Sequence, residues 1–281
     1  MFNKHNFLLL KYRKLDILEI EFSNNLKNIS KEIIFKLLNS INYDIKMISI
    51  VINIKNLDIE LLNFTINTLK QMKKSISLTV KGKIKNDKLY NLKNNISQFR
   101  FILNDEVENY IDYLYNNFKT KSNDIVFIYE VSKIDIFINR IKPLIKKRNY
   151  IFNISIKNSI SISDYWKLAN ELSSLKSKFP LNVLYDVSCA AIKYKNLQGI
   201  CPGFLCLLCI DVDGYGKFCY KEKANYKYNI NKYNLDYIFN NIYKEYLPQN
   251  YCKKFKICFG GCPIHRTKSC NKYCGMKGDK I

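Results

Sequence analysis

The distribution of cysteine and glycine divides this 281-residue chain into two unlike parts. All ten cysteines lie between Cys189 and Cys274, and eight of the nine glycines lie at or after Gly199. Residues 1–188 contain no cysteine and a single glycine. The sequence therefore predicts two domains, residues 1–188 and residues 189–281, with the thiol chemistry confined to the second.

Composition and charge narrow the class of protein. Hydrophobic residues make up 47% of the chain, enough to bury a sizeable core. The net charge is +22, but the lysines are spread along the chain without a dense arginine run or a known nucleic-acid-binding motif. The apolar run Phe7–Leu10 is too short for a signal peptide, and no stretch approaches the roughly 20 apolar residues that span a bilayer. We expect a cytoplasmic protein without nucleic-acid or membrane partners, where clustered cysteines hold metal more often than they form disulfides.

The first 188 residues alternate short runs of β-branched residues with amphipathic helical patterns. Strands are predicted at Asp16–Phe22, Lys46–Ile54, Ser75–Val80, Gln98–Leu103, Asp124–Tyr129, Tyr150–Ile156 and Val183–Asp186. Helices are predicted at residues 31–41, 59–72, 107–118, 132–145 and 164–176, with a shorter one near Lys88. Such alternation indicates an α/β fold with a parallel sheet, and about six units suggest a partial (β/α) barrel.

Local signals in this part are structural rather than chemical. Ser132 and Asp135 have the spacing of a capping box, and Pro143 should kink or end the helix that follows them. There is no phosphate-binding glycine loop and no Ser/His/Asp constellation. The only histidines are His5 and His265, and we read both as incidental. The first domain therefore offers no catalytic residue.

The cysteine-rich part begins with a spacing that includes a turn. Twelve residues separate Cys201 from Gly214, and four more separate Gly214 from Cys219. The segment Ile210–Tyr220 predicts a β-hairpin, because Asp213-Gly214 supplies the positive-φ turn between apolar strand residues. A hairpin here would place Cys219 at a fixed distance from Cys201.

The later cysteines follow a second spacing. Cys252, Cys258 and Cys262 form a C-x5-C-x3-C pattern. The remaining cysteines are Cys189, Cys206, Cys209, Cys270 and Cys274. Gly260-Gly261 would let backbone N–H groups approach a sulfur atom. Two cubane iron–sulfur clusters need eight thiolates, whereas a zinc ribbon usually shows two C-x2-C pairs and this chain has one, Cys206–Cys209. We therefore favour iron–sulfur clusters over zinc, and both over disulfides.

These motifs resemble the SPASM domain, the auxiliary-cluster module of radical SAM peptide-modifying enzymes. Cys201, Gly214 and Cys219 match the first part of that pattern, and the C-x5-C-x3-C stretch matches the second. The resemblance covers roughly residues 199–275. One departure is Gln249, which stands where the family has a further cysteine, and the chain ends in two cysteines where one is usual.

The resemblance implies two [4Fe-4S] clusters. The first would use Cys201, Cys219 and Cys262, with a fourth ligand from Cys189, Cys206 or Cys209. The second would use Cys252, Cys258, Cys270 and Cys274. All ten cysteines are thus candidate metal ligands.

The first domain is similar to the radical SAM partial barrel in its strand–helix order, but lacks that family's chemistry. The family places CX3CX2C after the first strand, where residues 23–30 contain no cysteine. Its Gly-Gly-Glu-Pro motif, which binds SAM after the second strand, is replaced by residues 54–57 (IKNL). Without three thiolates the SAM-cleaving cluster cannot be held, so we expect a pseudo-radical-SAM protein that neither binds nor cleaves SAM.

The resemblance implies an accessory role in the maturation of a ribosomally made peptide (RiPP). Such a protein would bind a precursor peptide, a maturation enzyme of the ATP-grasp or active radical SAM type, or both, and its clusters would serve structure or electron relay. Two alternatives stay open. One is an enzyme that uses an open auxiliary cluster directly, for which Gln249 is the one hint. The other is a zinc-binding structural module.

Overall fold

The computed structural model describes residues 14–22, 31–41, 44–84, 87–103, 108–147, 150–156, 160–179, 181–183, 194, 197, 206–220, 222 and 226–246. They belong to two compact units. The first is drawn from Met1–Arg100, Asn117–Asp124 and Pro202–Tyr246, and the second from Phe101–Asn116, Ile125–Cys201 and Leu247–Ile281. The predicted domain boundary between residues 188 and 189 lies outside the described residues and stays a prediction.

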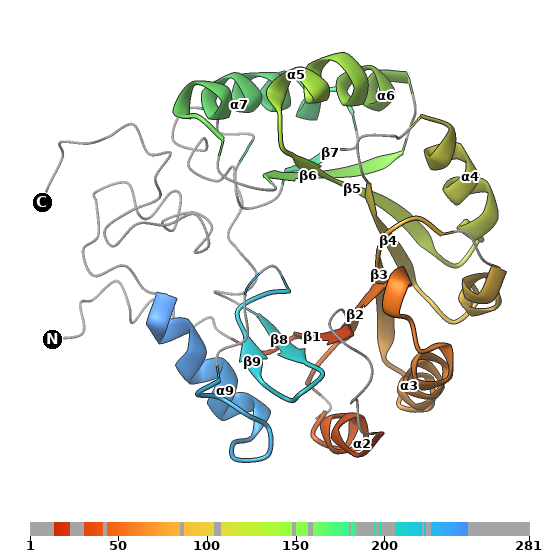
Figure 1. Ribbon diagram of the computed structural model, residues 1–281, viewed down its shortest axis with the longest axis vertical. Helices are drawn as coiled ribbons and strands as arrows, with labels where there is room; N and C mark the ends of the chain where they lie inside the picture. Colours follow the sequence, from red (N-terminus) through yellow and green to blue (C-terminus); the bar gives the residue numbers. More distant parts are fainter. Residues whose placement is uncertain are drawn as a thin grey trace, which may run out of the picture. The chain divides into compact units, whose positions relative to one another are not determined.

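The first unit contains the strands that carry the candidate site. They are β1 (Ile17–Phe22), β2 (Met47–Asn53), β3 (Ser75–Lys81), β8 (Leu207–Asp211) and β9 (Gly216–Lys217). Their order is β3-β2-β1-β8-β9, with every pair parallel except the hairpin β8–β9. The helices of this unit are α2 (Lys31–Asn39), α3 (Ile59–Gln71) and α9 (Leu235–Ile242) (Figure 1). β8 therefore extends the parallel sheet at β1.

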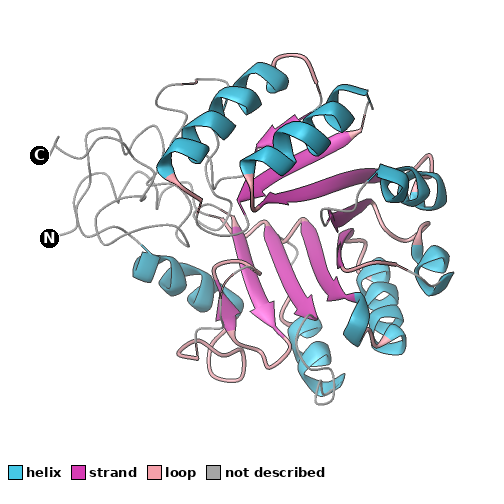
Figure 2. Cartoon of the chain, turned by 45° about the horizontal axis from the view of Figure 1, so that its top comes forward, coloured by secondary structure: helices cyan, strands magenta, loops and turns pink. Residues whose placement is uncertain are grey.

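The second unit has the same layered construction. Its strands β5 (Asp124–Val131), β6 (Ile151–Ile156) and β7 (Leu181–Val183) are parallel neighbours. Its helices are α4 (Glu108–Phe118), α5 (Ile134–Ile136), α6 (Lys142–Lys147) and α7 (Ile162–Lys176). β4 (Gln98–Leu103) contributes residues to both units. In each unit, helices accompany the strands (Figure 2). The α/β class with parallel strands is confirmed.

Parallel strands that are buried on both faces explain the apolar runs in the sequence. Ile50 and Val51 are neighbours on β2 and therefore lie on opposite faces, and each is 0% exposed. α3 begins where the Asp58 side chain accepts a hydrogen bond from Leu61 N at 3.0 Å. Its buried residues are Leu61, Leu62, Thr65, Ile66 and Leu69. The predicted helical period therefore marks the core face.

One predicted helix start is wrong. α5 begins at Ile134, and its N-cap residue Lys133 is extended and makes no side-chain capping bond, so Ser132 does not cap it. The turns from Phe137 to Ile141 are π-helical. They end two residues before Pro143, which has no N–H to continue the helical hydrogen-bond pattern. The predicted end of the helix at Pro143 is wrong, because α6 (Lys142–Lys147) continues through it; the change near this residue is from π-helical to α-helical turns.

The predicted hairpin is confirmed around Gly214. Gly214 has φ +82°, and Asp211 Oδ1 accepts hydrogen bonds from Asp213 N at 3.0 Å and Tyr215 N at 2.8 Å. Gly214 O in turn accepts a hydrogen bond from Ile230 N at 2.9 Å. A side chain at Gly214 would have to share its space with Ile230, because a Cβ there would meet Ile230 Cγ1 at 2.8 Å. The turn thus needs glycine both for its dihedral angle and for its packing.

Gly214→Ala should be more destabilising than Gly82→Ala, although both glycines have positive φ. Gly82 has φ +98°, but an added Cβ would meet nothing closer than Ile54 Cβ at 3.7 Å. We expect a loss of about 1 kcal/mol for Gly82→Ala from backbone strain and about 1–3 kcal/mol more for Gly214→Ala from overpacking. Urea denaturation of both variants measures the difference, and equal losses would contradict the packing argument.

None of the helices within the described residues is long and apolar enough to cross a membrane.

Candidate functional site

A row of polar side chains crosses the sheet of the first unit. Strand pairing places Glu19 between Ser49 on β2 and Cys209 on β8, with Ser77 beyond Ser49 and Lys217 beyond Cys209. Laterally paired residues of a sheet share a face. All five are buried, from 0% to 3% exposed. One face of this sheet therefore holds charge and hydroxyl groups where a parallel sheet usually holds apolar side chains.

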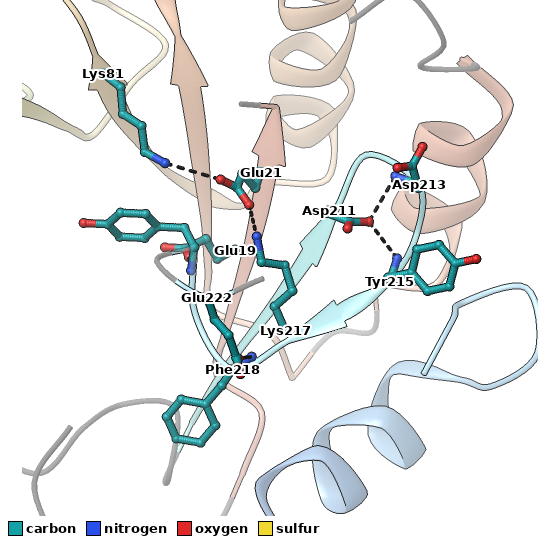
Figure 3. A network of polar contacts seen from close by, with 10 residues as sticks. Glu19, Glu21, Lys81, Asp211, Asp213, Tyr215, Lys217, Phe218 and Glu222 are labelled. Carbon is teal, nitrogen blue, oxygen red and sulfur yellow. Dashed lines mark hydrogen bonds and ion pairs between the residues drawn. The ribbon is translucent and has the colours of Figure 1, made fainter. Parts of the chain in front are cut away.

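Glu21, two residues after Glu19 on β1, forms the ionic centre of this face (Figure 3). Its Oε2 pairs with Lys217 Nζ on β9, and both side chains are only 4% exposed. Its Oε1 lies 3.3 Å from Lys81 Nζ on β3, whose side chain is 27% exposed. One carboxylate thus links three strands, and one of its two cations is fully enclosed.

Glu19 accepts hydrogen bonds from around it. Tyr220 N donates to Oε1 at 2.9 Å, and Ser49 Oγ lies 3.5 Å from Oε2. The Cys209 side chain, paired with Glu19 across the strands, lowers the pKa of this carboxylate. Burial raises the pKa of Glu19, and the positive charge of Arg100 together with these hydrogen bonds opposes that rise. Glu19 is therefore a carboxylate in a dry environment that is held by neighbouring donors.

Cys209 is enclosed within the sheet beside Glu19, and its ligand role stays a prediction. It is 0% exposed, and burial together with the charges of Glu19 and Glu21 raises its pKa well above the usual value for a thiol. Metals bind the thiolate rather than the thiol. Of the three cysteines that the structure describes, Cys209 is the one that is fully buried.

Cys219 lies in a different setting, on the turn that follows β9. Its side chain is partly exposed. Phe218 N donates to Glu222 Oε2 at 2.9 Å, and Glu222 N donates to the Cys219 carbonyl at 3.1 Å. Lys81 Nζ lies 4.7 Å from the centre of the Tyr220 ring, over the same turn. A partly exposed thiol on an ordered turn suits a cluster ligand.

Three further polar atoms on this part of the sheet have no hydrogen-bond partner among the described residues. They are Ser77 Oγ, Thr79 Oγ1 and Arg100 Nε. Ser77 is 1% exposed and Thr79 is 0% exposed. Buried polar atoms usually have hydrogen-bond partners, so these three atoms mark where the polar face lacks hydrogen bonds.

The structure describes three of the ten predicted ligands, Cys206, Cys209 and Cys219. The Cys206 carbonyl accepts hydrogen bonds from Asp16 N at 3.0 Å and Ile17 N at 2.9 Å, which joins it to the start of β1. The other candidates lie outside the described residues: Cys189, Cys201, Cys252, Cys258, Cys262, Cys270 and Cys274. Within the described residues, no three His, Cys, Asp or Glu side chains come together as a metal site. The ligand sets stay predictions.

The fold has known counterparts. Two crystal structures of SuiB from Streptococcus suis, one of them bound to S-adenosylmethionine, match with a TM-score of 0.58 each. The identities are 14% and 13%, and both matches cover 97% of this chain and 81% of SuiB. No family model matches the sequence, and no curated protein matches it either. The likeness concerns the fold, and it supports the α/β architecture with a parallel sheet that the sequence predicts.

Glu19, Glu21 and Lys217 are not among the site residues predicted from the sequence. A signal for the first two was present, since they occupy alternate positions in the otherwise apolar strand Ile17–Phe22. Two acidic residues on one face of a strand predict either a solvent-facing side or a buried polar network. In β1 the two residues belong to a buried polar network, because Glu19 is 2% exposed and Glu21 is 4% exposed.

Proposed function

We propose that this chain is an iron–sulfur-binding accessory protein in the maturation of a ribosomally made peptide, and that it does not cleave SAM. One combination of observations carries the proposal. The fold resembles that of an S-adenosylmethionine-bound protein over 97% of the chain, yet residues 1–188 contain no cysteine. Residues 23–30, which follow β1, therefore offer no thiolate for a SAM-cleaving cluster.

The cysteine-rich part supplies the proposed cofactor. Its ten cysteines suffice for two [4Fe-4S] clusters, and Cys219 lies partly exposed on an ordered turn. Bound clusters would provide a rigid metal centre and could accept or donate an electron. The chain's own contribution is the surface that binds a precursor peptide, a maturation enzyme of the ATP-grasp or active radical SAM type, or both.

An assay for SAM cleavage tests the proposal that this chain does not cleave SAM. We expect the anaerobically reduced protein, incubated with SAM, to form no 5′-deoxyadenosine above a protein-free blank, because no cysteine in residues 1–188 can hold the required cluster. An active radical SAM enzyme in the same buffer provides the positive control. Turnover above the blank would overturn the assignment as an accessory protein.

Metal analysis and binding test the remaining parts. About eight iron atoms per chain would support two clusters, about four would support one, and zinc without iron would favour the structural-module alternative. A pull-down against the products of neighbouring genes tests the partner. A protein that retains neither a precursor peptide nor a maturation enzyme would contradict the accessory role.

A further inference from the structure

Cys219 lies between two contacts that both reach β1. Two residues before it, Lys217 Nζ pairs with Glu21 Oε2. One residue after it, Tyr220 N donates to Glu19 Oε1 at 2.9 Å. A side chain before Cys219 and a backbone N–H after it are thus each bound to a carboxylate of the same strand.

These contacts are shielded from water. The side chains of Lys217 and Glu21 are 4% exposed, and Glu19 is 2% exposed. Hydrogen bonds to ionised groups are stronger than those between neutral groups, and buried charges are little screened by salt. Surface ion pairs contribute little to position because both partners stay hydrated. The two contacts to β1 are buried, unlike surface ion pairs, and should therefore restrict the position of the turn strongly.

The turn itself limits the remaining freedom of Cys219. Glu222 N donates to the Cys219 carbonyl at 3.1 Å, and Glu222 Oε2 accepts from Phe218 N at 2.9 Å. The backbone of Cys219 is therefore bounded on both sides, while its side chain is partly exposed. An ordered backbone with an accessible sulfur is what a cluster ligand requires.

We propose that Glu19 and Glu21 are positioning residues for Cys219. Their carboxylates hold the residues that flank this cysteine and thereby set where its thiolate meets the auxiliary cluster. The inference rests on the proposed function, since it assigns Cys219 a metal. By this inference, β1 helps to position a cysteine of the cysteine-rich part of the chain. β1 is the strand that precedes the cysteine-free residues 23–30.

Variants of Lys217 test the ionic contact on the loaded protein. Lys217→Met removes the charge that Glu21 binds, and Lys217→Arg retains it. The control is Glu171→Gln, which breaks the pair between Glu171 Oε2 and Lys142 Nζ, 2.5 Å apart, in the second unit. We expect Lys217→Met to release iron to a chelator about tenfold faster than wild type and to alter the electron paramagnetic resonance spectrum, as substitutions beside metal ligands commonly do. Lys217→Arg should restore most of the wild-type behaviour, and Glu171→Gln should leave both readouts unchanged.

A second measurement separates positioning from metal binding. In the metal-free chain, iodoacetamide alkylates exposed thiols, and mass spectrometry of the peptide that contains Cys219 gives the rate for that residue. We expect Lys217→Met and Glu19→Gln to change this rate severalfold, with Glu171→Gln at the wild-type rate. Unchanged alkylation and iron release in a chain that holds iron would overturn the positioning role alone. A wild-type chain without iron would overturn the proposed function and, with it, the ligand role of Cys219.

Discussion

Replacing Glu21 with glutamine is expected to lower the free energy of unfolding by about 3–5 kcal/mol, the usual cost of removing one partner from a buried ion pair. The reason is the enclosure of Lys217, whose side chain is 4% exposed. Its ammonium group would keep its burial but lose the carboxylate that compensates it. Lys81, the second cation on Glu21, is 27% exposed and can turn its amine toward water. Urea denaturation under anaerobic conditions measures the change.

The reciprocal substitution should be milder. Lys217→Met leaves Glu21 buried, but Glu21 retains Lys81 at 3.3 Å. We therefore expect roughly half the loss seen with Glu21→Gln. The double variant Glu21→Leu/Lys217→Met removes both charges and should come within about 1–2 kcal/mol of wild type. Equal losses for the two single variants would show that Lys81 does not support Glu21.

The second large effect concerns iron. Cys219→Ala is expected to reduce the iron content by about four atoms per chain, the content of one cubane cluster, whereas Cys209→Ala should leave the iron content unchanged. Both substitutions remove one thiol from the same hairpin region. They differ because Cys219 is partly exposed on a turn, while Cys209 is buried beside two carboxylates that raise its pKa. This prediction depends on the proposed iron–sulfur cofactor.

Iron and sulfide are measured after anaerobic reconstitution, with circular dichroism as a check that both variants remain folded. Equal iron loss in the two variants would mean that the buried thiol is also a ligand. Retention of all iron in Cys219→Ala would remove Cys219 from the first cluster and leave Cys201 and Cys262 to be explained with other partners.

The sequence predicted most regular elements because their signals are local. Strand Gln98–Leu103 is found with the predicted bounds, and the Asp213-Gly214 turn is found where a positive φ was required. The helix after Ser132 illustrates the limit of such signals. Capping spacing and apolar period were both present, but the helix begins at Ile134 and turns π-helical from Phe137. The period of the apolar residues shows which side chains face the core. It does not show whether successive turns have α-helical or π-helical hydrogen bonds.

The candidate site was predictable only in part, because its central contacts are not local. Cys219 was identified by its spacing from Gly214. The partners of Glu21 were not, since Lys217 lies 196 positions away and meets Glu21 only because β8 pairs with β1. The residue pattern within β1 or β8 does not reveal that these two strands pair with each other. The acidic residues of β1 indicate that a buried cation is needed, but only the tertiary structure shows which cation pairs with them.

The parallel pairing of β8 with β1 also has a consequence during synthesis of the protein. Translation proceeds at about 5–20 residues per second, so the 196 positions between Glu21 and Lys217 correspond to about 10–40 seconds. Throughout that interval β1 has an open edge and Glu21 lacks its enclosed counter-ion. The nascent sheet can be completed only when the hairpin leaves the ribosome. The edge of β1 that pairs with β8 is therefore covered only late in the synthesis of the chain.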